Sequence, residues 1–153
     1  GDNVGLVFTT VLDQVSLGLV DEDEEVQETT DRSFWEKRAT KKTVAVVDEF
    51  LEIVRKFDTT LELKYNKFYI GLARNGQPDN FAIFRPKKDW VRLELRLKRT
   101  DGTQERLETA GLDVMDYDER WGRYRIRMSP ADITKHADLL SSLLEEAYQA
   151  AHH

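Results

Sequence analysis

The stretch Trp90–Arg99, WVRLELRLKR, decides the fold. From Val91 onward, apolar residues occupy every second position and charged residues occupy the positions between them. Alternation over this length is typical of a β-strand with one face in the core and the other outside it. The stretch Arg123–Met128, RYRIRM, repeats the pattern with arginine at every second position. Both stretches are predicted to be strands of a sheet that is covered on one face.

Three more strands are predicted upstream, where short runs rich in apolar residues are separated by turn signals. They cover residues 61–65, 68–73 and 81–84. Asn75-Gly76 and the nearby Pro78 mark the turn between the second and the third of them. Consecutive strands with short turns pair as an antiparallel meander. The sheet is therefore predicted to contain about five strands.

A long helix is predicted before the strands and a short one among them. Ser33 and Glu36 form a capping box that opens an amphipathic helix ending near Phe57. After the turn Asp101-Gly102, Thr103 is expected to cap a short helix over residues 104–110. Gly111 is predicted to stop that helix in the left-handed conformation.

The last helix is predicted to begin at Ser129-Pro130, an N-cap residue followed by proline at the first helical position. Its apolar stripe contains Ile133, His136 and Leu140. The order is helix, four strands, helix, strand, helix. This order predicts the α+β fold class: an antiparallel sheet of about five strands with helices packed on one face.

Charge is distributed unevenly along the 153 residues, whose net charge is −6. Residues 1–31 hold nine acids and no base, which leaves 20 acids and 23 bases for residues 32–153. The acidic run Asp21–Glu25 is typical of a solvated linker. A second interpretation is an acidic tail that competes for the basic surface of the remaining chain.

These differences predict the domain organisation. Residues 1–20 are interpreted as a residual segment of a preceding domain or an extra strand, and 21–31 as an acidic linker. Residues 32–150 are predicted to form a single α+β domain, and 151–153 are interpreted as a tag remnant. Val4–Leu12 is β-rich, but so short a run is read equally well as the start of a helix.

The sequence offers no catalytic machinery. It has no cysteine, which excludes disulfides and thiolate chemistry, and no phosphate-binding loop or nucleophile elbow. We expect His136 to be a packing residue. The acids of one loop are spaced unlike an EF-hand and fit a solvated loop better than a cation site: Asp113, Asp116, Asp118 and Glu119. We therefore expect no enzyme activity, no catalytic residue, no cofactor and no metal.

We expect a cytoplasmic protein with no membrane partner. No apolar run approaches the roughly 20 residues that cross a bilayer, and the first residues carry no basic signal-peptide region.

The sequence feature that most favours a binding function is the predicted outward face of the sheet. If the two arginine-bearing strands are neighbours, they form a basic surface with aromatic residues beside it, which attracts phosphate and offers stacking to bases. The candidate nucleic-acid-binding residues are Lys87, Lys88, Trp90, Arg92, Arg96, Lys98, Arg123, Arg125 and Arg127. The alternative is an ordinary solvated face whose arginines pair with Glu94 or Glu62.

Several short motifs together resemble a family of uncharacterised bacterial C-terminal domains. The resemblance covers about residues 31–149 and rests on Asp31–Glu36, Tyr65–Lys67, Tyr69–Gly71, Phe84–Lys88 and Leu144–Tyr148. Members of that family carry the label "predicted transport protein", and their layout is similar to small YjbR-type α+β domains, some proposed to bind DNA. The resemblance implies an upstream nuclease-like domain in the same chain, and it assigns no active site.

Three functional hypotheses follow. The first is a non-catalytic accessory domain that binds DNA or RNA through the basic sheet face. The second is a protein-interaction or oligomerisation module, with a homodimer among its forms, because Val4–Leu12 could extend another sheet. The third is a small-ligand site between sheet and helix, lined by Tyr65, Tyr69 and Arg85.

Overall fold

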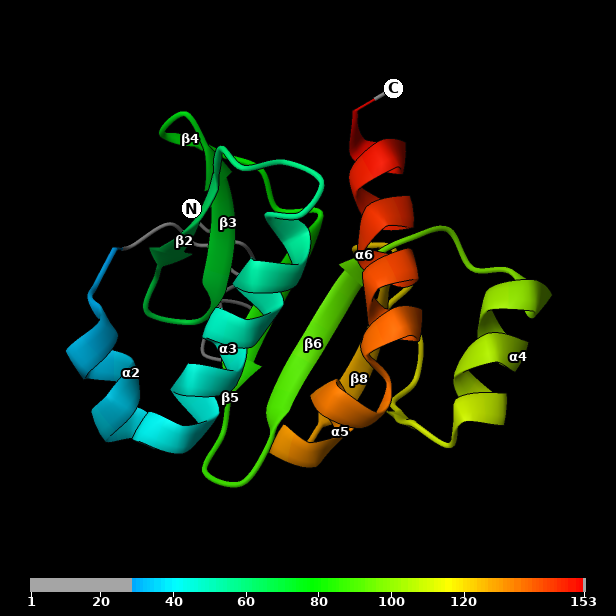
Figure 1. Cartoon of the computed structure of the whole chain (residues 1–153), viewed down its shortest axis with the longest axis horizontal. Coiled ribbons are helices and arrows are strands. Elements are labelled where there is room, and N and C mark those ends of the chain that lie inside the picture. The colour runs from blue at the N-terminus through cyan, green and yellow to red at the C-terminus, as the bar shows by residue number, and fades with distance from the viewer. Residues whose placement is uncertain (1–28, 153) are drawn as a thin grey trace, which may run out of the picture.

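The computed structural model describes residues 29–152 (Figure 1). The expected segment 1–20, the acidic run and the strand candidate Val4–Leu12 lie outside these residues. The elements, in chain order, are α2 (Arg32–Arg38), α3 (Lys41–Val54), β2 (Leu61–Tyr65), β3 (Ile70–Arg74), β4 (Gln77–Pro78), β5 (Ala82–Pro86), β6 (Val91–Arg96), α4 (Asp101–Ala110), β7 (Asp113–Val114), β8 (Arg123–Met128), α5 (Pro130–Lys135) and α6 (Ala137–Ala151).

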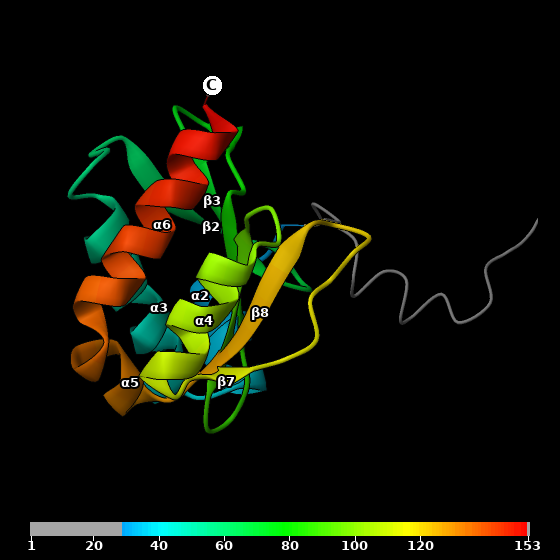
Figure 2. The same ribbon diagram turned by 90° about the vertical axis from the view of Figure 1, so that its right-hand side faces the viewer.

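The strands form one antiparallel sheet in the order β2-β3-β5-β6-β8-β7, and β4 pairs with β3. Helices α3 and α6 cover one face of it (Figures 1 and 2). The predicted α+β class with an antiparallel sheet is confirmed. The described sheet has seven strands rather than about five, because the two-residue strands β4 and β7 carry no alternation that a sequence could show.

The core lies between the sheet and its helices. Phe50 of α3 stacks on Phe84 of β5, with ring centroids 5.2 Å apart. Leu93 of β6 and Ile126 of β8 face each other in the sheet, and both are fully buried beneath the helices, as is Leu140 of α6. Burying each such side chain contributes about 1.5–3 kcal/mol, so this layer is the main source of stability.

The long helix predicted from Ser33 to Phe57 is two helices. Asp31, not Ser33, is the first N-cap, because its side chain accepts from the N–H of Phe34 (2.9 Å). The second helix has its own N-cap in Thr40, whose hydroxyl accepts from the N–H of Thr43 (3.1 Å). The capping box at Ser33 was therefore wrong.

Two tertiary contacts explain why the chain breaks between these helices. Trp35 is buried, and its indole N–H donates to the carbonyl of Asn66 (2.8 Å) in the β2–β3 turn. Glu36, expected to close the capping box, accepts instead from Arg32 Nε (3.2 Å). Arg32 also donates to Asp48 of α3 (2.6 Å), a hydrogen bond that raises the pKa of the guanidinium. These contacts anchor α2 to the β2–β3 turn through Trp35 and to α3 through Arg32.

The short middle helix begins earlier than predicted. Thr100, not Thr103, is its N-cap and accepts from the N–H of Thr103 (3.1 Å), so Asp101-Gly102 forms its first turn. Thr100 is itself held by Tyr124, which accepts from its N–H (2.9 Å). Gly111 ends the helix with φ of 75°, as the sequence predicts.

The last predicted helix is divided at His136. The start at Ser129-Pro130 is confirmed, and the Ser129 N–H donates to the Asp132 carboxylate (2.8 Å). His136 ends α5 and is the N-cap of α6, and it is half-buried at this junction. Its predicted place on a continuous apolar stripe was therefore wrong.

Gly71 lies where β3 and β5 separate. Only Ile70 and Phe84 pair between these strands. Beyond this pair, the Asn80 side chain takes over and accepts from the N–H of Leu72 (3.0 Å). A Cβ at Gly71 would lie 2.4 Å from Asn80 Oδ1 and 3.0 Å from Tyr69 Cε2. Gly71 therefore leaves room for the Asn80 side chain, whose hydrogen bond here replaces one between strands.

The substitution Gly71→Ala is expected to destabilise the protein by about 1–3 kcal/mol, because Asn80 must move and lose its hydrogen bond. Urea unfolding measures the change. Gly102→Ala is the matched control: nothing lies within 4 Å of its added Cβ in the first turn of α4. Alanine is favoured there by up to about 1 kcal/mol. Equal stability of the two variants would contradict the role given to Gly71.

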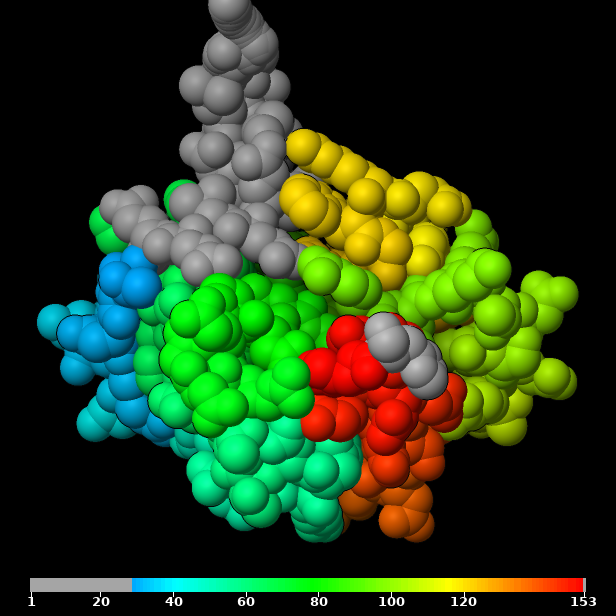
Figure 3. Space-filling view, turned by 90° about the horizontal axis from the view of Figure 1, so that it is seen from above, coloured from blue at the N-terminus to red at the C-terminus, as the bar shows by residue number. Residues whose placement is uncertain are grey.

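The end of α6 is fastened to the β2 side of the sheet. Tyr148 donates to Asp58 Oδ2 (2.7 Å), and Asp58 also accepts from the N–H and hydroxyl of Thr60. In Figure 3 the end of α6 lies beside the β3–β4 region, where His152 contacts Asp79 (2.9 Å). The hydrogen bonds from Thr60 and Tyr148 lower the pKa of Asp58.

Because the pKa of Asp58 is lower in the folded state, its contribution to stability is present above the ordinary carboxyl pKa of about 3.9. It is lost as the pH falls through the folded value. Asp58→Asn is expected to cost about 1–2 kcal/mol at pH 7 and to reduce the loss of stability on acidification. Unfolding curves between neutral and acidic pH measure both effects. The exposed Asp89→Asn is the control, and an unchanged acid limb in Asp58→Asn would contradict the assignment.

Candidate nucleic-acid interface

The two arginine-bearing strands are neighbours, as the candidate interface requires. In the antiparallel register of β6 and β8, Arg92 lies opposite Arg127, Glu94 opposite Arg125, and Arg96 opposite Arg123. Residues between these positions, such as Leu93, point into the core. The charged set therefore lies on the sheet face away from α3 and α6. We call the following residues the arginine face: Arg85, Arg92, Glu94, Arg96, Arg123, Arg125 and Arg127.

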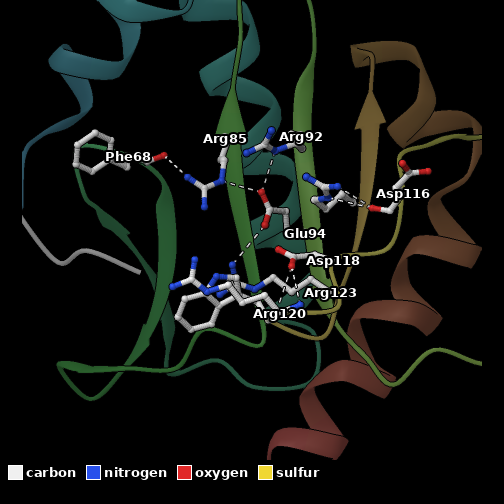
Figure 4. A network of polar contacts seen from close by, with 10 residues as sticks. Phe68, Arg85, Arg92, Glu94, Asp116, Asp118, Arg120 and Arg123 are labelled. Atoms are coloured by element: carbon white, nitrogen blue, oxygen red, sulfur yellow. Dashed lines mark hydrogen bonds and ion pairs between the residues drawn. The ribbon is translucent and has the colours of Figure 1, made fainter. Parts of the chain in front are cut away.

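One carboxylate organises the centre of the arginine face. Arg85 Nε and Arg92 Nε both donate to Glu94 Oε2, at 2.7 and 2.9 Å. Arg123 Nη1 donates to Glu94 Oε1 at 3.4 Å. Figure 4 shows the three guanidinium groups, from three different strands, directed at this side chain. Arg85 and Arg123 are 1% exposed and Glu94 is 2% exposed, so the cluster is buried.

Because the cluster is buried, only a few arrangements of its side chains are stable. A buried ion pair requires good geometry and further hydrogen bonds before its attraction offsets the loss of hydration. Arg85 obtains one such bond by donating Nη1 to the carbonyl of Phe68 (2.8 Å). The central arginines are thereby held in fixed directions. Pairing of arginines with Glu94, one alternative from the sequence, is present in the structure, but this part of the face is buried rather than solvated.

The proposed ligand trio of Tyr65, Tyr69 and Arg85 is not brought together. Tyr65 lies opposite Ile70 in the register and shares its helix-covered face, where its hydroxyl accepts from Arg32 (3.1 Å). Tyr69 precedes Ile70 and points to the other face, with Arg85 5.7 Å from its ring centroid. The three residues therefore do not line one surface between sheet and helix, because strand alternation separates them.

Aromatic residues flank the arginine face at both ends. At the Val91 end of β6, the Arg127 guanidinium lies 5.4 Å from the Trp90 ring centroid. At the other end, Arg120 and Arg123 each lie 5.4 Å from the Trp121 ring centroid. Both tryptophans are half-buried. Cation–π contacts of this kind hold the guanidinium groups in place without neutralising them.

Exposure differs between the centre of the face and its margin. Arg96 and Arg125 are half-buried, and Arg125 donates twice to the carbonyl of Asp116 (3.1 and 2.9 Å). Burial lowers the pKa of Arg96 and raises that of the adjacent Tyr69. The remaining candidates from the sequence lie at the margin: Lys87 is half-buried, whereas Lys88, Lys98 and Arg127 are exposed.

Lys98 lies beyond the end of its strand. The predicted strand reached Arg99, but β6 ends at Arg96, because the N–H of Leu97 turns back to the Leu95 carbonyl (3.0 Å). The Leu97 carbonyl accepts from the Tyr117 hydroxyl (2.7 Å) instead of from a strand. Lys98 therefore extends the margin of the face rather than its regular ladder.

Acidic residues of β7 and of the loop after it lie beside the arginine face. Asp113 contacts Arg127 at 3.4 Å. The Asp118 carboxylate accepts from the N–H groups of Arg120 and Trp121, which shapes the turn into β8. Within residues 29–152 there is no group of three or more side chains placed to hold a metal ion. Over the same residues, no helix combines the length and apolar character needed to cross a bilayer.

A protein family described as Domain of unknown function (DUF5655) matches residues 31–151. The chain belongs to the DUF5655 family. The matched region begins at the N-cap of α2 and ends with the last residue of α6, so the DUF5655 domain is the folded unit described above. The resemblance to a family of uncharacterised domains is confirmed at that level. Comparisons with curated proteins and with solved structures gave no match.

The Glu94 cluster of this DUF5655 domain generates a test of stability. Glu94→Gln preserves the side-chain volume but leaves three buried guanidinium groups without their shared carboxylate. We expect a loss of about 3–5 kcal/mol in the free energy of unfolding, measured in urea. Glu62→Gln is the matched control, because Glu62 is an exposed residue of β2 on the same sheet face. A similar small effect in both variants would show that Glu94 does not organise the face.

Proposed function

We propose that this DUF5655 domain is a non-catalytic module that binds the phosphate backbone of DNA or RNA through the arginine face. The observation that carries the proposal is the register of β6 and β8, which places five arginines and one glutamate on the same side of two paired strands. Arginine is suited to phosphate because its planar fork donates two parallel hydrogen bonds.

The buried centre and the exposed margin contribute differently. Glu94 binds Arg85, Arg92 and Arg123 in the buried centre, which holds together the three strands that carry the face. The exposed bases at the margin make the phosphate contacts, and contact with a polyanion releases counterions from it. Affinity therefore depends strongly on salt and little on base sequence.

The dimensions of the arginine face fit a short nucleic-acid segment. The six residues of β6 separate the Trp90 end from the Trp121 end, which corresponds to about 17 Å at 3.3 Å per residue. This length matches about five steps of a duplex strand at 3.4 Å per step. In a single strand, unpaired bases would stack on the tryptophan at either end.

The similarity in layout to YjbR-type domains agrees with this proposal. YjbR-type domains share the α+β layout, and DNA binding has been suggested for some of them. A bacterial, cytoplasmic protein with a nuclease-like domain upstream would meet nucleic acid routinely. The features of the arginine face do not support the label "predicted transport protein" that members of the resembling family carry.

The test is fluorescence anisotropy of the full chain with labelled single-stranded and double-stranded DNA and RNA, at about 50 mM and about 200 mM salt. The variant Lys98→Glu/Arg120→Glu/Arg127→Glu reverses three exposed bases and leaves the Glu94 cluster in place. Arg127 and Lys98 lie at the margin of the face, and Arg120 extends this margin beside Trp121. Loss of three phosphate contacts is expected to reduce the slope of log affinity against log salt by about two to three.

The control variant makes the same change in net charge on the other side of the sheet. It is Lys42→Glu/Arg55→Glu/Lys56→Glu, at exposed positions of α3 and the turn after it. We expect this variant to retain most of the affinity. Absence of binding at low salt, or an equal loss in both variants, would reject the arginine face as a nucleic-acid site.

A further inference from the structure

We propose that the acidic run Asp21–Glu25 of this chain docks on the arginine face and occupies it when no nucleic acid is bound. The first observation is where the described chain begins. Thr29 pairs with Asn66, and the N–H of Thr30 donates to the Tyr65 carbonyl (2.9 Å). The chain therefore enters the fold at the β2–β3 turn.

This entry point adjoins the arginine face. The same turn contains Phe68, whose carbonyl accepts from Arg85 Nη1 (2.8 Å). Arg85 is one of the three arginines on Glu94, so the chain enters the fold two residues from a direct partner of the cluster. The acidic run precedes Thr29 by only four to eight residues.

The length of the intervening chain matches the distance to be covered. Neighbouring strands lie about 4.8 Å apart, and in the order β2-β3-β5-β6-β8 the face extends three to four strand spacings from β2. This corresponds to about 14–19 Å. An extended chain gains about 3.3 Å per residue, so Glu25 reaches about 13 Å from Thr29 and Asp21 about 26 Å. The five acids therefore span the distances to β6 and β8.

Charge complementarity selects this surface. The run consists of five consecutive acids, whereas the arginine face holds six arginines and one glutamate. The main competing basic surface is Lys37–Lys42, at the junction of α2 and α3. In that surface Arg38 is held by a hydrogen bond to the carbonyl of Lys67 (2.8 Å), but Lys37, Lys41 and Lys42 are exposed lysines. Such flexible side chains would lose more freedom on binding.

Docking of this run would make nucleic-acid binding competitive. A tethered segment acts at an effective concentration in the millimolar range for a short linker, so even weak contacts keep the face occupied. Nucleic acid would then displace the run rather than meet an open surface. The docking itself does not depend on the proposed function, because it requires only the acids and the arginine face.

The experiment measures paramagnetic broadening in the full chain without nucleic acid. The chain has no cysteine, so Val20→Cys gives one attachment site for a nitroxide directly before the acidic run. We expect loss of amide signal intensity in β6 and β8, and recovery of these signals at high salt. Amides in α5 and the second half of α6, on the helix-covered side, are expected to keep their intensity.

Two charge-matched variants test the cause of the broadening. The first neutralises the run by converting its aspartates to asparagine and its glutamates to glutamine, which is expected to restore the β6 and β8 signals. The second neutralises five exposed acids on the helices and is expected to leave the broadening intact: Glu49, Glu52, Glu105, Asp138 and Glu145.

Three results would overturn the proposal. Broadening confined to Lys37–Lys42 would place the run on another basic surface. Broadening that is unchanged after neutralisation of the run would show that the acids do not cause it. Broadening that appears between a nitroxide-labelled copy and a separate isotope-labelled copy would assign the contact to a second molecule. This experiment contains no nucleic acid. Failure of the docking would therefore not count against the nucleic-acid proposal, which the anisotropy titration tests separately.

Discussion

The buried carboxylate of Glu94 is the constraint on which the arginine face depends. Three guanidinium groups from β5, β6 and β8 share it, and all four side chains are at least nine-tenths buried. Buried charges are tolerated only when they are closely matched. One residue therefore links three strands in their observed register, and the directions of the surrounding arginines follow from that register. A strand shift of one residue would turn the arginines into the apolar layer.

The same strands carry the core on their other side, so the two faces reinforce each other. Leu93 precedes Glu94 and packs with Ile126 beneath the helices, while Glu94 binds the arginines on the far side. The Phe50–Phe84 stack fixes β5 against α3, which also fixes Arg85 one residue later. Helix packing thereby determines where a charged group lies on the opposite surface. A substitution in the core would be expected to disturb the arginine face through this register.

Local sequence signals predicted the parts of the fold that depend on neighbouring residues. Alternation identified β6 and β8, and Gly111 and Ser129-Pro130 marked helix ends correctly. The break between α2 and α3 could not be predicted in this way, because it depends on Trp35 reaching the carbonyl of Asn66, 31 residues away. Pairing with Glu94 was one alternative from the sequence, but the cluster of three arginines was not predicted. Arg85 and Arg123 are distant in sequence, and only the strand order β5-β6-β8 brings both to one carboxylate.

Fixed arginine geometry favours carboxylates as well as phosphates, and this bears on how the two proposed ligands would compete. A tethered acidic run gains from its effective concentration, but it offers only five charges. A duplex carries one charge for about each 1.7 Å of its axis, so a long nucleic acid can contact more of the exposed margin at once than five acids can. The buried centre alone would not distinguish the two ligands. Selectivity would come from the exposed bases Lys98, Arg120 and Arg127, which a longer polyanion contacts at the same time.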